Sequence, residues 1–460
     1  MTPRARPTVA LALAAALLTA ALLAVAGPAA GSTSDGGTPE ERTETLTPIK
    51  HFITLMQENH SFDNYFGTYP GADGFPEGLC EPVDLDRPDA GCVEPYPIGD
   101  DAISDLAHSA ETFEMQYNGG EMNGFVAAHG DRPADVAALA MGYYDDYNLP
   151  YYWNIADEYV LFDRFFTASN GGSVRNHFYW VTGTPGNYEQ DSLKPEGFDE
   201  IPTIFDRLQE AGISWKFYVQ NYNPEINFLA DLDEGDHAQL VWVPLLNYRR
   251  FVTDPELSSR IVPLDEFYED LENDTLPAVS YVVPSGSSEH PPGSIQAGER
   301  FVRAMLTSLM RSDSWESSAF MWTYDDWGGW YDHVEPPQVD EYGYGFRAPA
   351  LLVSPYARRG HIDSTELDFT SMIAFITHNW GLEPLADRDR NATPFFDAFD
   401  FESDPRPAVL LGREREPPTI DRANAGVVYA AYGSSVAIAV GCIGLAAMTT
   451  WLTGRRRRST

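Results

Sequence analysis

The chain has 460 residues, 43% of them hydrophobic and 13% aromatic, which is enough for a large buried core and excludes a disordered chain. Its 30 Lys and Arg face 69 Asp and Glu, and a net charge of −39 would repel the phosphates of DNA or RNA, so we expect no nucleic-acid partner. We interpret the acidity as an aid to solubility. An anionic substrate would then need a local cation that reverses the sign of the field at its site.

The first residues have the layout of a secretory signal. Arg4 and Arg6 precede an apolar run at residues 9–26, and small residues at 29–31 offer a cleavage site. We predict a signal peptide over residues 1–31, with an uncleaved N-terminal anchor as the alternative. Either one exports the chain.

The middle of the chain predicts one catalytic domain. A spacer rich in Ser, Thr, Gly and Glu covers residues 32–47, and residues 48–411 show no repeat or low-complexity break. Apolar runs of strand length recur at residues 49–56, 214–219, 278–283, 318–324 and 348–353. Helical patterns separate them, including residues 203–211, 295–310 and 368–380. This alternation predicts an α/β fold with a mostly parallel sheet sandwiched by helices, whose ligand site gathers at the carboxyl ends of the strands.

The first predicted strand runs directly into Glu58 and Asn59. A carboxylate and an amide on adjacent residues offer hard oxygen ligands to a divalent cation. A helix cap or a turn explains the same two residues equally well.

Cys80 and Cys92 stand in a loop rich in Pro, Asp and Gly. In the oxidising compartment that the export signal implies, we expect them to form a disulfide, with two unpaired thiols as the alternative. Their spacing excludes a CxxC metal site.

Ser173 follows two glycines and precedes a helical-looking aromatic stretch at residues 178–182. A hydroxyl at the start of a helix can approach an anion closely while backbone N–H groups point at it. Ser173 is therefore the candidate nucleophile, with Ser169 and Thr167 as poorer candidates. A helix N-cap explains the serine equally well.

Asp325 and Asp326 follow the predicted strand at residues 318–324. Two carboxylates this close repel each other unless a cation compensates them. A solvated acidic turn is the alternative, but the glycines and aromatic residues that come next do not resemble a solvated surface. The pattern therefore favours a metal site.

Three of the ten histidines, His108, His290 and His333, stand in polar, turn-like contexts. A lone histidine is more often structural than a ligand, so they improve the case for a site only modestly. The chain has no P-loop, no GxGxxG after a strand, no HExxH and no GxSxG. Their absence argues against Walker-type nucleotide hydrolases, dinucleotide enzymes, zincins and ordinary esterases.

The C-terminal part predicts a membrane anchor. Polar residues 412–425 read as a stalk, and residues 426–454 carry no charge and exceed the roughly 20 residues that cross a bilayer core. Four arginines follow, and such an excess marks the cytoplasmic side. We predict a single-pass helix at 426–454, a cytoplasmic tail at 455–460 and a catalytic domain outside the cell membrane.

The order of short motifs carries a family resemblance. The motifs are Glu58-Asn59-His60-Ser61-Phe62-Asp63, Gly71 and Gly74, His108, Gly171-Gly172-Ser173 with Asn176, Ser288-Glu289-His290-Pro291, Gly298-Glu299, Asp325-Asp326 with Gly328-Gly329, Tyr331-Asp332-His333-Val334, Gly345-Phe346-Arg347-Ala348-Pro349 and Ser354-Pro355-Tyr356. Together, over about residues 48–402, they resemble the bacterial phosphoesterase family, which holds phospholipases C and an acid phosphatase branch. The resemblance implies an alkaline-phosphatase-like fold and a divalent metal ion of unidentified kind.

The resemblance also implies roles for particular residues. Metal ligands would be Glu58, Asn59, Ser173, Asp325 and Asp326; the nucleophile Ser173; phosphate-binding or proton-transfer residues His108 and His290; and substrate-binding residues Asn176 and His333. The chain departs from the family at Ser173 where Thr is common, at His177 and His60 where Arg is usual, and at Phe369 where His is usual. These departures leave open whether the substrate is a phosphate monoester or a phospholipid.

The resulting hypothesis is an exported, membrane-anchored, metal-dependent phosphoesterase that acts through a phosphoserine intermediate at Ser173. The alternative is a non-catalytic cell-surface binding module on the same fold. The presence of Ser173 and of the two predicted metal-ligand pairs, Glu58-Asn59 and Asp325-Asp326, argues against that alternative. The sequence leaves the oligomeric state open.

Overall fold

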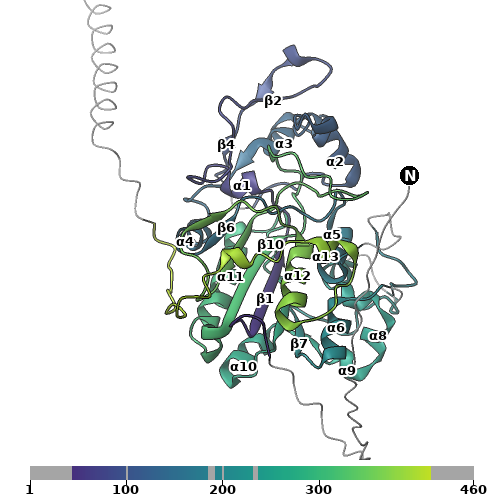
Figure 1. Ribbon diagram of the computed structural model, residues 1–460. Coiled ribbons are helices and arrows are strands. Elements are labelled where there is room, and N and C mark those ends of the chain that lie inside the picture. Colours follow the sequence, from purple (N-terminus) through teal and green to yellow (C-terminus); the bar gives the residue numbers. More distant parts are fainter. Residues whose placement is uncertain (1–43, 100–101, 185–191, 199–200, 232–236, 416–460) are drawn as a thin grey trace, which may run out of the picture. The chain divides into compact units, whose positions relative to one another are not determined.

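The computed structural model describes residues 44–99, 102–184, 192–198, 201–231 and 237–415, which all belong to one unit of contacts. Its centre is an eight-stranded sheet with the order β12-β6-β11-β10-β1-β9-β7-β8 (Figure 1). From one edge to the other the strands are β12 (His361–Asp363), β6 (Val160–Phe162), β11 (Ala350–Val353), β10 (Ser318–Tyr324), β1 (His51–Gln57), β9 (Val279–Val283), β7 (Trp215–Val219) and β8 (Ile261–Pro263).

Neighbouring strands of this sheet pair in parallel except at β11, which runs antiparallel to both β10 and β6. The predicted mostly parallel sheet is therefore confirmed. β1, β9 and β10 are buried along nearly their whole length, as expected of central strands covered on both faces. The register pairs Gln57 of β1 with Tyr324 of β10, so the residues that follow these two strands emerge side by side.

Helices cover both faces of the sheet. Contacts join α4, α10 and α11 in one group and α5, α6, α12 and α13 in another, and Figure 1 shows the two groups on opposite sides of the strands. The α-helices are α1 (Phe62–Phe66), α2 (Ala110–Tyr117), α3 (Ala134–Ala138), α4 (Pro150–Glu158), α5 (Ser173–Thr182), α6 (Ile204–Ala211), α7 (His237–Trp242), α8 (Arg249–Thr253), α9 (Pro255–Ser258), α10 (Asp265–Asn273), α11 (Ile295–Leu309), α12 (Phe369–Trp380) and α13 (Asp387–Asn391). The predicted sandwich of helices around the sheet is confirmed.

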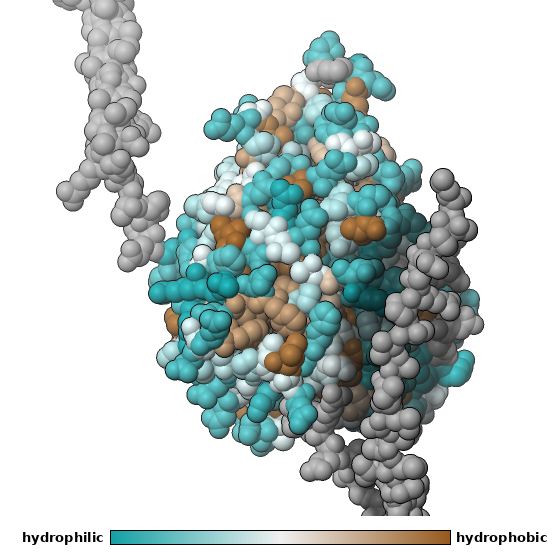
Figure 2. Space-filling model, in the orientation of Figure 1, coloured by the Kyte–Doolittle hydropathy of each residue, from teal (hydrophilic) through white to brown (hydrophobic). Residues whose placement is uncertain are grey.

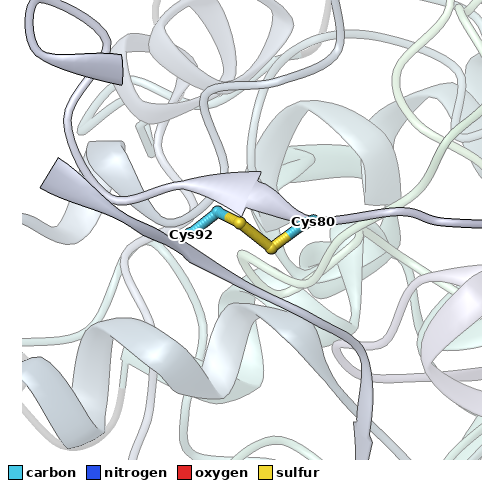
Figure 3. The surroundings of a disulfide bond; sticks show 2 residues. All are labelled: Cys80 and Cys92. Atoms are coloured by element: carbon cyan, nitrogen blue, oxygen red, sulfur yellow. A yellow bond between two sulfur atoms is a disulfide. The ribbon is translucent and has the colours of Figure 1, made fainter. Parts of the chain in front are cut away.

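The segment between β1 and α4 forms a cap beyond the carboxyl end of β1 (Figure 1). It contains two small sheets, β2 (Glu81–Pro82) with β3 (Cys92–Val93) and β4 (Tyr96–Pro97) with β5 (Gly142–Tyr143). The predicted disulfide is present, and it joins Cys80, just before β2, to Cys92 at the start of β3, with Cα atoms 5.4 Å apart (Figure 3). The bridge therefore closes the short segment of the cap that carries β2 and β3.

Hydrophilic side chains cover most of the face in Figure 2, with apolar residues scattered among them. Within the described ranges, no helix combines the length and the apolar character needed to cross a membrane. The predicted signal peptide, the anchor at 426–454 and the basic tail lie outside those ranges, as do most of the stalk and most of the spacer.

Candidate active site

The two pairs of predicted metal ligands, Glu58 with Asn59 and Asp325 with Asp326, meet at the carboxyl ends of adjacent strands and are called the acidic pairs below. Glu58 and Asn59 follow β1, Asp325 and Asp326 follow β10, and the Asp325 N–H donates to the carbonyl of Gln57 at 3.1 Å. All four side chains are buried, Glu58 being 5% exposed and the others 0%. The structure therefore excludes a solvated acidic turn after β10.

A glycine allows the turn after β10 to lie against Asn59. Gly328 has φ +64°, and a Cβ at this position would lie 2.1 Å from the Asn59 carbonyl oxygen. Its N–H donates to Asp326 Oδ1 at 2.8 Å. Any other residue at this position would collide with the Asn59 backbone, so the glycine allows the two acidic pairs to lie next to each other.

Ser173 is the first residue of α5, and Gly172 occupies the N-cap position. The serine is therefore not the N-cap. Its hydroxyl donates to Asp326 Oδ2 at 3.4 Å, which places the predicted nucleophile beside the predicted metal ligands. Ser169 and Thr167 are fully buried in the loop before α5, where their side chains make hydrogen bonds within the loop.

Asn176 lies beneath the loop that carries Ser173. Its Oδ1 accepts from the Ser169 N–H at 3.1 Å, and its Nδ2 donates to the Gly171 carbonyl at 3.0 Å. The side chain is 0% exposed and does not line the cavity described below. Its predicted contact with substrate stays a prediction, whereas its observed contacts shape the loop around the nucleophile.

His108 and His290 come together at the same place, with ring centroids 5.5 Å apart. His108 Nδ1 donates to the Leu106 carbonyl at 2.7 Å, so its Nε2 accepts from Asn59 Nδ2 at 3.0 Å. His290 Nδ1 donates in the same way to the Pro291 carbonyl at 2.7 Å, which leaves its Nε2 as the acceptor nitrogen.

A cavity of about 530 Å³ opens over these groups. It brings together four of the predicted site residues, Glu58, Ser173, His108 and His290, with Asp105 and Arg132 as further charged groups. The complete lining is Glu58, Asp105, Leu106, Ala107, His108, Ser109, Arg132, Gly172, Ser173, Val174, Ala238, Val241, Trp242 and His290. The apolar part of this wall can hold a hydrocarbon portion of a substrate next to a polar reaction centre.

His333 belongs to a different cluster of charges. Its Nδ1 contacts Asp63 Oδ2 at 2.7 Å and its Nε2 contacts Asp73 Oδ1 at 3.2 Å. The fully buried Arg347 forms ion pairs with Asp63 and Asp332 at 3.0 and 2.8 Å. Burial lowers the pKa of His333, but the hydrogen bond to Asp63 leaves that pKa above its usual value. His333 does not line the cavity, and its predicted contact with substrate also stays a prediction.

The acidic pairs carry more negative charge than a buried site tolerates without a cation. Burial, followed by the charges of Asp325 and Asp326, raises the pKa of Glu58 well above its usual value. Burial and the charge of Asp326 do the same to the pKa of Asp325. Asn59 Oδ1 and both carboxylate oxygens of Asp325 are buried without a hydrogen-bond partner. These oxygen atoms fit a divalent cation, because it would satisfy them and cancel the repulsion.

The sequence interpretation missed three residues of this region. His177 lies one helical turn after Ser173 and next to Glu58, and the signal for it was the spacing of four residues on a helix. Asp105 lines the cavity beside His108. Glu289 precedes His290 and accepts hydrogen bonds from three buried tyrosines, which no local pattern indicates.

The comparison with known sequences decides the family. The profile of the phosphoesterase family matches residues 49–383. The chain belongs to the phosphoesterase family. It is therefore a hydrolase that acts on phosphoric ester bonds. This confirms both the resemblance and the predicted class of enzyme.

Relatives of this phosphoesterase include phospholipases C. Phospholipase C B of Mycobacterium tuberculosis is 28% identical over 79% of this chain and 80% of its own length. The non-hemolytic phospholipase C of Burkholderia pseudomallei is 27% identical over 77% of this chain but only 58% of its own length. A protein of the alkaline phosphatase superfamily from Vibrio parahaemolyticus aligns over 50% of this chain and 60% of its own, with 14% identity and a TM-score of 0.32. A score this low supports no conclusion about function.

Proposed function

We propose that this chain is an exported, membrane-anchored, metal-dependent phosphoesterase that cleaves phospholipid-type phosphate esters through Ser173. One observation supports this most directly. Ser173, Glu58 and two histidines line one cavity, and the Ser173 hydroxyl donates to Asp326. The neighbouring Asn59 and Asp325 have buried oxygens without hydrogen-bond partners. The names of its relatives favour a phospholipid substrate.

Glu58, Asn59, Asp325 and Asp326 would hold the cation, each by a side-chain oxygen. The cation would supply positive charge to the phosphoryl oxygens and lower the pKa of the serine hydroxyl. Asn59 is oriented for this role, because its Nδ2 donates to His108 and its Oδ1 is thereby left free. A bound cation would also offset the repulsion between an anionic substrate and a chain with a net charge of −39.

Ser173 Oγ attacks phosphorus, forming a P–O bond while the bond to the leaving alcohol breaks. Its proton passes first towards Asp326 Oδ2, the carboxylate oxygen to which the hydroxyl donates at 3.4 Å. His290 can act as the acid in this step through Nε2, the nitrogen that does not contact the backbone, by giving a proton to the leaving alcohol. Water then attacks phosphorus and gives its proton to His290. The bond between phosphorus and Ser173 Oγ breaks, and Asp326 returns the proton to the serine oxygen.

The test measures release of p-nitrophenol from p-nitrophenyl phosphate and from p-nitrophenyl phosphorylcholine by the full chain in detergent. We expect release that a chelator stops and that Ser173→Ala lowers by about a thousandfold or more. Ser403→Ala, at an exposed serine, is the matched control. Full activity in Ser173→Ala would remove the serine from the mechanism, and release from the monoester alone would make the enzyme a phosphomonoesterase.

The exported location has its own test. The signal at residues 1–31 and the uncharged stretch before four arginines support it, as does a disulfide in the cap. Protease added to intact cells should remove the catalytic domain and leave an epitope tag at the C-terminus intact. Protection of the domain until the cells are lysed would refute this orientation.

A further inference from the structure

His177 has a buried ring nitrogen without a hydrogen-bond partner. Its side chain is 0% exposed, and its Nδ1 lies 3.0 Å from the Ser173 carbonyl oxygen, which can only accept a hydrogen bond. Nδ1 therefore carries the ring proton. Nε2 has the free lone pair and is buried without a hydrogen-bond partner. A backbone carbonyl that fixes one ring nitrogen is the usual support for a histidine whose other nitrogen binds a metal.

The His177 ring lies beside the acidic pairs. Nε2 lies 3.9 Å from Glu58 Oε1, and Nδ1 lies 3.7 Å from Asp325 Oδ2. Both separations are too long for hydrogen bonds. Two ligands that each lie about 2.1 Å from one ion are at most about 4.2 Å apart, so the 3.9 Å separation suits a shared cation. Glu58, His177 and Asp325 each offer one atom, and the three atoms lie within 4.8 Å of one another.

We propose that His177 Nε2 is a further ligand of the cation held by Glu58, Asn59, Asp325 and Asp326, and that this site therefore selects a cation that accepts nitrogen. This inference rests on the proposed metal-dependent function. A lone pair that faces a carboxylate oxygen in a buried site is repelled unless a cation lies between them. An imidazole ligand suits Zn²⁺ and similar transition metals, whereas Mg²⁺ and Ca²⁺ prefer oxygen ligands only.

The first experiment measures metal affinity rather than activity. The full chain, stripped of metal by a chelator, is titrated with Zn²⁺ and separately with Ca²⁺ by calorimetry, and Co²⁺ binding is followed by visible absorption. We expect His177→Gln to weaken Zn²⁺ binding about tenfold or more, to change the Co²⁺ bands and to leave Ca²⁺ binding nearly unchanged. The matched control is His378→Gln, at an exposed histidine of α12.

Two results would overturn the inference while leaving the proposed function intact. One is an unchanged Zn²⁺ affinity and Co²⁺ spectrum in His177→Gln. The other is an equal loss of Zn²⁺ and Ca²⁺ binding, which indicates that His177 only packs beside the site. If the unmutated chain binds no divalent cation, the proposed function fails together with the inference.

A second measurement keeps the proposal testable if His177→Gln does not fold. Pulsed EPR of Cu²⁺ bound to the full chain detects imidazole nitrogen directly. It is recorded on the double variant His108→Gln and His290→Gln, in which His177 is the imidazole that faces Glu58 and Asp325. Nitrogen coupling in that variant supports the ligand assignment, and its absence overturns it.

Discussion

Glu289 makes a strong prediction about stability and pH. It is fully buried, its Oε2 accepts from Tyr65 and Tyr324 at 2.5 and 2.8 Å, and its Oε1 accepts from Tyr152 at 2.6 Å. Burial raises the pKa of Glu289 from 4.5 to about 8, although the three hydroxyl donors oppose that rise. The carboxyl group therefore stays protonated in the folded protein at pH values where it ionises in the unfolded chain.

The sign of the effect follows from proton binding. Between pH 4.5 and about 8 the folded state binds more protons at Glu289 than the unfolded state does, so the stability from this group falls as pH rises. It is fully present below pH 4.5 and is lost as pH rises through about 8. At about 1.4 kcal/mol for each unit of pKa, the loss is about 5 kcal/mol.

Glu289→Gln removes this ionisation and should therefore remove the associated pH dependence. Free energies of unfolding from urea titrations at pH 5 and pH 8 give the two changes to compare. The unmutated chain should lose about 3.5 kcal/mol more than the variant over this range, because part of the full loss lies below pH 5 and part above pH 8. Subtracting the change in the variant from the change in the unmutated chain cancels the contribution of other groups that titrate between pH 5 and pH 8. The control is Glu272→Gln, at an exposed site on α10. Equal pH dependence in Glu289→Gln and the unmutated chain would refute the reasoning.

Two further substitutions test the buried ion pairs of Arg347 and the glycine turn after β10. Arg347→Met should lower the free energy of unfolding by about 3–5 kcal/mol, because it leaves two buried carboxylates without their partner. The control Arg359→Met, at an exposed arginine, should change stability little. Equal free energies of unfolding for the two variants in urea titrations would contradict the role of the buried ion pairs. Gly328→Ala should weaken cation binding about tenfold, measured by calorimetry, because the new methyl group displaces Asn59. Gly78→Ala is the control, because Gly78 also has a positive φ of +75° but has open space around the new methyl group. If both variants weaken cation binding equally, backbone strain rather than displacement of Asn59 is responsible.

The central part of the fold could be predicted from the sequence. β10 has the predicted bounds, and α12 begins one residue after the predicted start because Asp368 is its N-cap. Long apolar runs and helix caps are local sequence signals, so these strands and helices can be predicted without knowing which elements pack against them. The three-residue strands β6, β8 and β12 were missed because a strand this short shows no alternation of polar and apolar residues, and it forms only where a neighbouring strand pairs with it.

The candidate site shows the same division. The sequence by itself determined that Glu58 and Asp325 would follow buried strands, and a parallel sheet brings such strand ends to one edge. Only the tertiary structure decided that Asn176 supports the nucleophile loop, that His333 pairs with Asp63, and that His177 faces the acidic pairs. The contacts of His333 and His177 join segments far apart in the chain, and those of Asn176 depend on how the loop before α5 folds back on the helix, so no local pattern predicts them.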